Sequence, residues 1–92
     1  MSAWGESVHA AGRCAVDNED CQGPLEAHHL IPRSHKLFRD DSQNGLSLCW
    51  QHHHGSRLSP HGAPAAFREW LKMHLPDKYN WMQENKWRTK TL

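Results

Sequence analysis

The chain has 92 residues, of which 37% are apolar, and its formal net charge is +1. This length suits one small domain and excludes two, and we find no apolar run that would span a membrane and no hydrophobic segment of a signal peptide. We therefore expect a single cytoplasmic domain over residues 1–92, with a thin core that a metal ion or disulfides would have to support.

Charge is distributed unevenly along the chain. Residues 1–27 contain one basic and five acidic residues, residues 28–65 contain four basic and two acidic residues, and residues 66–92 contain six basic and three acidic residues. A polyanion would therefore approach the later two thirds of the chain. An ordinary solvated surface explains the same pattern equally well.

The first part of the chain predicts a helix, a loop and a strand. Residues 3–11 can form a short helix, which the following glycine ends. Residues 13–23 are typical of a loop between two cysteines, and Leu25–His29 has the pattern of a strand. A proline then ends regular pairing, and the polar residues 33–43 predict a second loop.

The middle of the chain predicts a second strand that leads into a helix. Asn44 and Gly45 form a turn signal, and residues 46–49 alternate apolar and polar side chains, as a strand does. Residues 49–58 predict a helix of about two to three turns. Residues 59–64 are rich in proline and glycine and read as a connector.

Two helices are predicted after the connector. Residues 64–74 begin with a proline, which the first turn of a helix tolerates, and their apolar side chains recur at intervals of three and four. Pro76 breaks this helix, and Asp77 can cap the next one. The large residues that we expect to pack in the core or between helices are Phe67, Trp70, Leu71, Trp81 and Trp87.

Four residues have the composition of a structural zinc site. The chain has three cysteines, an odd number that fits a disulfide framework poorly and a Cys/His site well. Cys49 and His52 are three residues apart on the predicted helix and share a face, and Cys14 and Cys21 would supply two ligands from the loop. Zinc bound there would stabilise the thin core. The alternative is three buried thiols and a surface histidine.

The stretch LEAHHLIPRSH, residues 25–35, places two histidines side by side on a strand. An asparagine follows at position 44, then the strand LSLC, and then LCWQHH at the start of a helix. In this order and spacing the chain resembles the HNH endonuclease family, over roughly Cys14 to Arg57.

The resemblance implies an α+β fold. Its centre would be a ββα-metal core, also called a His-Me finger, formed by residues 13–58 and supported by the structural zinc. An N-terminal helix would precede this core, and residues 64–92 would form a helical C-terminal extension.

Hydrolysis of a phosphodiester needs a base for the attacking water and positive charge near the reacting phosphate. Adjacent residues of a strand point to opposite faces, so one of His28 and His29 can hold a metal ion while the other faces the water. Adjacent residues of a helix lie about 100° apart, so His52 can face the zinc while His53 faces the catalytic ion.

The resemblance implies a role for each matching position. His29 would be the general base, and His28 and His53 would hold the catalytic divalent metal. Asn44 would brace the loop so that a backbone carbonyl orients the base, or it would contact the metal. Asn44 is also compatible with a simple turn residue.

Some members of the family carry a further histidine one turn after the helix ligand, and here that position is Arg57, on the same face of the predicted helix as His53. Arg57 can contact the scissile phosphate or remain a solvated residue. With two histidine ligands, and with water and phosphate in the remaining positions, the catalytic ion is expected to be Mg²⁺ or Mn²⁺. His54 is an alternative ligand, which leaves the coordination open. Arg33 and His35 are candidate nucleic-acid contacts. For the remaining histidines we expect surface or core-edge positions: His9, His61 and His74.

The resemblance thus implies an endonuclease that cuts DNA with low sequence preference and leaves 5′-phosphate and 3′-hydroxyl ends. It also suggests a phage or mobile-element origin, with a homodimer or a recombination protein as possible partner. Two other readings stay open. One is a non-catalytic zinc-containing DNA-binding module, and the other is a structural zinc domain that binds protein through its Trp-rich tail.

Overall fold

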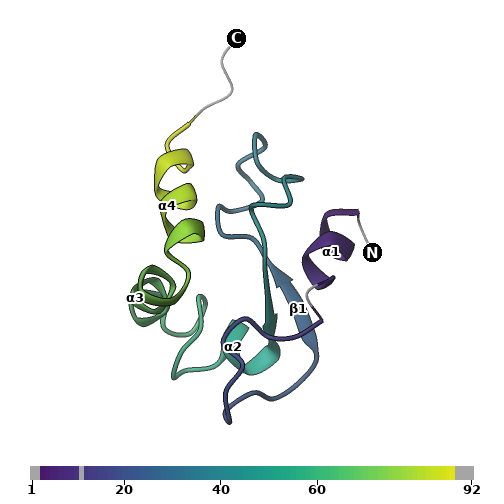
Figure 1. Cartoon of the computed structure of the whole chain (residues 1–92), viewed down its shortest axis with the longest axis vertical. Helices are drawn as coiled ribbons and strands as arrows, with labels where there is room; N and C mark the ends of the chain where they lie inside the picture. Colours follow the sequence, from purple (N-terminus) through teal and green to yellow (C-terminus); the bar gives the residue numbers. More distant parts are fainter. Residues whose placement is uncertain (1–2, 11, 89–92) are drawn as a thin grey trace.

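The structure is a computed structural model that describes residues 3–10 and 12–88 (Figure 1). Its elements, in chain order, are α1 Ala3–His9, β1 Leu25–His28, β2 Leu46–Cys49, α2 Trp50–His54, α3 Pro64–His74 and α4 Pro76–Asn85. The expected α+β class and the expected order of helices and strands are confirmed. Within the described ranges, none of the helices is long and apolar enough to cross a membrane.

The two strands form an antiparallel hairpin that leads directly into α2. Leu25 lies opposite Cys49, and His28 lies opposite Leu46. Because opposite residues share a face and every second residue returns to it, Glu26 and His28 lie on the same face of the hairpin. Helix α1 lies on one side of this ββα unit, and α3 and α4 lie on the other (Figure 1).

The core joins the ββα unit to the C-terminal helices. Its buried cluster consists of Cys14, Leu46, Leu48, Cys49, Phe67 and Leu71. The core positions predicted for Phe67 and Leu71 on α3 are therefore confirmed. Trp81 of α4 adds a second connection, because its ring meets Phe38 edge-on at a centroid distance of 5.4 Å.

Helix α2 is shorter than the predicted helix over 49–58. Cys49 is its N-cap and accepts a hydrogen bond from the backbone N–H of His52. The chain turns to an extended conformation at Gly55, where the Ser59 hydroxyl donates to the Gly55 carbonyl. Arg57 therefore lies beyond the helix, and the prediction that it shares a helical face with His53 is wrong.

Four further predictions need correction. The first strand ends at His28, one residue early, and the first helix ends at His9, while residue 11 of its predicted span lies outside the described residues. Asp77 does not cap α4, because the helix starts one residue earlier at Pro76, where the missing N–H has no cost. Trp87 lies beyond the end of α4 and its side chain is 79% exposed, so it does not belong to the core.

Candidate metal centres and active site

The four predicted zinc ligands meet in space. The sulfur atoms of Cys14, Cys21 and Cys49 lie 3.6, 3.5 and 3.2 Å from Nδ1 of His52. A tetrahedral zinc ion, with bonds of about 2.3 Å to sulfur and about 2.0 Å to nitrogen, separates a sulfur ligand from a nitrogen ligand by about 3.5 Å. All three cysteines are free thiols, so the cluster can hold a tetrahedral metal ion such as zinc.

A second cluster consists of His28, His53 and His61, whose ligand nitrogens all lie within 4.8 Å of one another. The ring centroids are 5.1 Å apart for His28 and His53, 5.3 Å for His28 and His61, and 4.8 Å for His53 and His61. These residues come from β1, from α2 and from the connector after α2. The backbone N–H of His61 donates to the His53 carbonyl at 3.3 Å, which holds the connector against the helix.

The sequence predicts two of these histidines as ligands and misses the third. His61 is exposed, as expected for a surface residue, yet its ring completes the cluster. No spacing rule points to it, because it reaches the cluster only after the chain has turned back along α2.

The environment of His28 favours the neutral imidazole. Burial, followed by the neighbouring histidines His53 and His61, lowers the pKa of His28 to about 3. At neutral pH this side chain therefore keeps a lone pair, which a metal ligand needs. The pKa of His53 is also lowered, mainly by burial.

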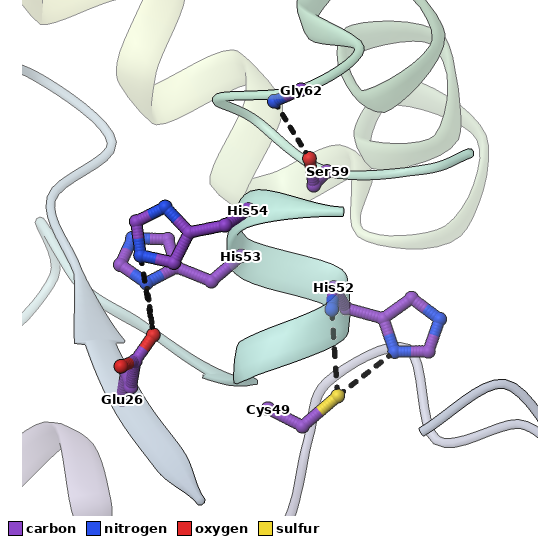
Figure 2. Close-up of polar contacts among 7 residues, drawn as sticks. All are labelled: Glu26, Cys49, His52, His53, His54, Ser59 and Gly62. Atoms are coloured by element: carbon purple, nitrogen blue, oxygen red, sulfur yellow. Dashed lines mark hydrogen bonds and ion pairs between the residues drawn. The ribbon is translucent and has the colours of Figure 1, made fainter. Parts of the chain in front are cut away.

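Glu26 orients the helix ligand. Its carboxylate oxygen Oε1 lies 2.8 Å from Nδ1 of His53 and 3.4 Å from Nε2 of His54 (Figure 2). Because the carboxylate accepts the Nδ1 proton, the lone pair of His53 is on Nε2. Glu26 was not among the predicted site residues, although period-two alternation places it on the same strand face as His28.

Asn44 is fully buried and braces the loop before it. Its Oδ1 accepts from the N–H of Ile31 at 2.6 Å, and its Nδ2 donates to the carbonyls of Ile31 and Phe38 at 2.9 and 3.1 Å. The next carbonyl, that of Arg39, lies 2.9 Å from Nε2 of His29. Asn44 therefore holds the loop whose Arg39 carbonyl contacts His29.

One cleft, with a volume of about 590 Å³, contains both His29 and the three-histidine cluster. Arg33 lines it from the loop after β1, and α3 forms the opposite wall with Phe67, Arg68 and Leu71. The candidate base, the candidate cation site and cationic side chains therefore line the same space.

Two predicted nucleic-acid contacts lie elsewhere. Arg57 is not among the described residues that line the cleft, and its guanidinium lies 3.7 Å from the carboxylate of Asp20. His35 packs against Phe38 at a centroid distance of 5.4 Å. Neither residue is brought to the three-histidine cluster.

The sequence model of the HNH endonuclease family matches residues 14–55. This span contains the Cys/His cluster, Glu26, His28, His29, Asn44 and His53. It does not include α1, His61 or the C-terminal helices. No curated protein and no solved structure matches the chain significantly.

Proposed function

Residues 14–55 belong to the HNH endonuclease family, and we propose that this chain is a metal-dependent nuclease that hydrolyses phosphodiester bonds in DNA. The observation that carries the proposal is the shared cleft, which His29 and the three-histidine cluster line together. Hydrolysis requires a base and a cation around one phosphate, and the cleft offers both.

His29 is the proposed general base. Nε2 of His29 lies 2.9 Å from the Arg39 carbonyl, and a carbonyl oxygen can only accept. The proton of the neutral ring is therefore on Nε2, and Nδ1 is free to take a proton from the attacking water. Imidazole is suited to this task near neutral pH.

The proposed cation site consists of His28, His53 and His61. Their nitrogens are close enough for one ion, and Glu26 fixes the tautomer of His53. A divalent ion bound there would supply positive charge to the phosphate and to the leaving 3′ oxygen. The sequence predicted two histidine ligands and therefore Mg²⁺ or Mn²⁺. With His61 as a third imidazole donor, the site favours Mn²⁺, Ni²⁺ or Zn²⁺ over Mg²⁺, because Mg²⁺ prefers oxygen ligands.

Arg33 and Arg68 are the proposed phosphate contacts in the cleft. Contacts to the phosphate backbone of DNA carry no sequence information directly, so low sequence preference is expected. Arg57 and His35, outside the cleft, stay predictions for contacts with flanking phosphates. The family implies 5′-phosphate and 3′-hydroxyl products, and we propose that a monomer nicks and a homodimer cuts both strands.

On the resemblance to HNH nucleases we also propose a cytoplasmic phage or mobile-element protein with a recombination partner. The proposed structural ion in the Cys/His cluster is zinc.

Supercoiled plasmid tests the function. We expect zinc-loaded protein to cleave the plasmid when Mn²⁺ or Ni²⁺ is added and to cleave it slowly with Mg²⁺. Cleavage should stop when the added ion is chelated. The variant His61→Asn should need a higher concentration of the same ion. If no ion supports cleavage while DNA binding weakens with salt, the chain is a DNA-binding module instead.

A further inference from the structure

An aromatic side chain from outside the matched segment covers the proposed base. Trp4, in the first turn of α1, lies parallel to His29, with ring centroids 3.6 Å apart and an interplanar angle of 7°. Both rings line the cleft. This is a face-to-face contact between a residue of α1 and the group proposed to take the proton.

One loop holds both rings. The indole Nε1–H of Trp4 donates to the Asp41 carbonyl at 3.1 Å, and Nε2 of His29 donates to the Arg39 carbonyl at 2.9 Å. The hydrogen bond to Arg39 fixes one edge of the imidazole and leaves the ring free to tilt about that edge. The parallel indole removes this freedom, because tilting would drive one ring into the other.

Helix α1 is itself anchored close to the hairpin. Val8, on the next turn of α1, is buried, and a Cβ at Gly45 would collide with its side chain. The approach of α1 therefore depends on the glycine before β2, and it sets where Trp4 lies.

From this geometry we propose that Trp4 is a positioning residue for His29. It holds the plane of the imidazole so that Nδ1 faces the water, and it shields one face of the ring from solvent. The inference rests on the proposed function of His29 as general base. Small displacements of a catalytic group can cost about 100-fold in rate, so the loss of the stack should be visible in kcat.

Two substitutions separate positioning from simple packing of α1. Trp4→Leu keeps an apolar side chain at the position and removes the flat ring, whereas Trp4→Phe keeps a ring that can stack. We expect Trp4→Leu to lower kcat for plasmid cleavage by about 10- to 100-fold with little change in KM, and Trp4→Phe to restore most of the rate. Trp87→Leu, at an exposed tryptophan, is the matched control and should cleave as the wild type does.

A nuclear magnetic resonance measurement reports on the stack without activity. The ring protons of His29, identified by their disappearance in His29→Ala, should be shifted upfield by the indole in the wild type. They should move back in Trp4→Leu.

The two readouts distinguish two failures. If the wild type cleaves and Trp4→Leu cleaves equally fast after the His29 signals have moved, the role of Trp4 is overturned and the proposed function stands. If the wild type shows the upfield shift and cuts no DNA with any ion, the proposed function fails, and the positioning role fails with it.

Discussion

His52 and His53 are adjacent on α2, and their side chains leave the helix in different directions, one to Cys49 and the other to Glu26 (Figure 2). The angle of about 100° between successive helical residues produces this separation. One short helix thus carries a ligand of the Cys/His cluster and a ligand of the three-histidine cluster. A metal ion in the first cluster would fix the helix that positions the second.

The first prediction follows from this dependence. Cys49→Ser removes a ligand sulfur while its hydroxyl can still cap α2, so the variant should lose its zinc through the missing ligand alone. Structural zinc contributes about 10–16 kcal/mol in small metal-dependent domains, so the variant should also lose cooperative thermal unfolding. Metal analysis and circular dichroism check both results. Met73→Ser, at an exposed sulfur-containing residue, should leave them unchanged. Full zinc content in Cys49→Ser would contradict the assignment.

Glu26→Gln should lower the metal affinity of the three-histidine cluster and leave that of the Cys/His cluster unchanged. The amide loses the charge that holds the Nδ1 proton of His53, and such outer partners of a metal ligand are worth about 10- to 100-fold in metal affinity. Calorimetric titration of zinc-loaded protein with Ni²⁺ measures the change. Glu19→Gln, on an exposed loop residue, is the matched control. Equal affinities for the two variants would show that Glu26 does not orient a ligand.

Local sequence patterns predicted much of the fold. Strand β2 and helix α3 have the predicted bounds, because alternation, the Asn-Gly turn and a proline at the first helical position are all signals between near neighbours in the chain. The Cys/His cluster was also predictable, since the spacing of Cys49 and His52 on one helical face already suggests a shared ion.

The rest of the candidate site depends on tertiary contacts. His61 reaches the cluster because the connector folds back along α2, and Trp4 reaches His29 because α1 packs beside Gly45. Neither contact leaves a periodic trace in the sequence. The early end of α2 has the same origin, since the Ser59 hydroxyl that contacts the Gly55 carbonyl comes from the connector.

Asn44→Ala should lower both stability and cleavage. The change leaves the N–H of Ile31 and two carbonyls without their buried partner, and each unsatisfied group costs about 1–3 kcal/mol. The loop that presents the Arg39 carbonyl to His29 would then loosen. Thermal unfolding and cleavage rates measure the two effects. Gln43→Ala, at the exposed neighbouring position, should have little effect on either. An unchanged melting temperature in Asn44→Ala would contradict the bracing role.

Acid should destabilise the protein over a defined range when the three-histidine cluster is free of metal. The pKa of His28 is about 3 in the folded chain, against 6.5 for an ordinary histidine. Between these values the unfolded chain binds a proton that the folded chain does not, so the free energy of unfolding falls as the pH decreases from about 6.5 to about 3. The lowered pKa of His53 acts in the same direction. Urea titrations at several pH values measure this slope, and His28→Asn should flatten it. A slope of equal size in His28→Asn would rule out His28 as its source.

The central claim is that His29 activates water at a phosphate held beside the three-histidine cluster. Its most direct test is the cleavage of supercoiled plasmid by the wild type and by His29→Ala, with the zinc content and Ni²⁺ affinity of both proteins measured in parallel. We predict equal zinc, similar Ni²⁺ affinity and cleavage by the wild type alone. Equal cleavage by His29→Ala would contradict the assignment of the base, and with it the proposed active site.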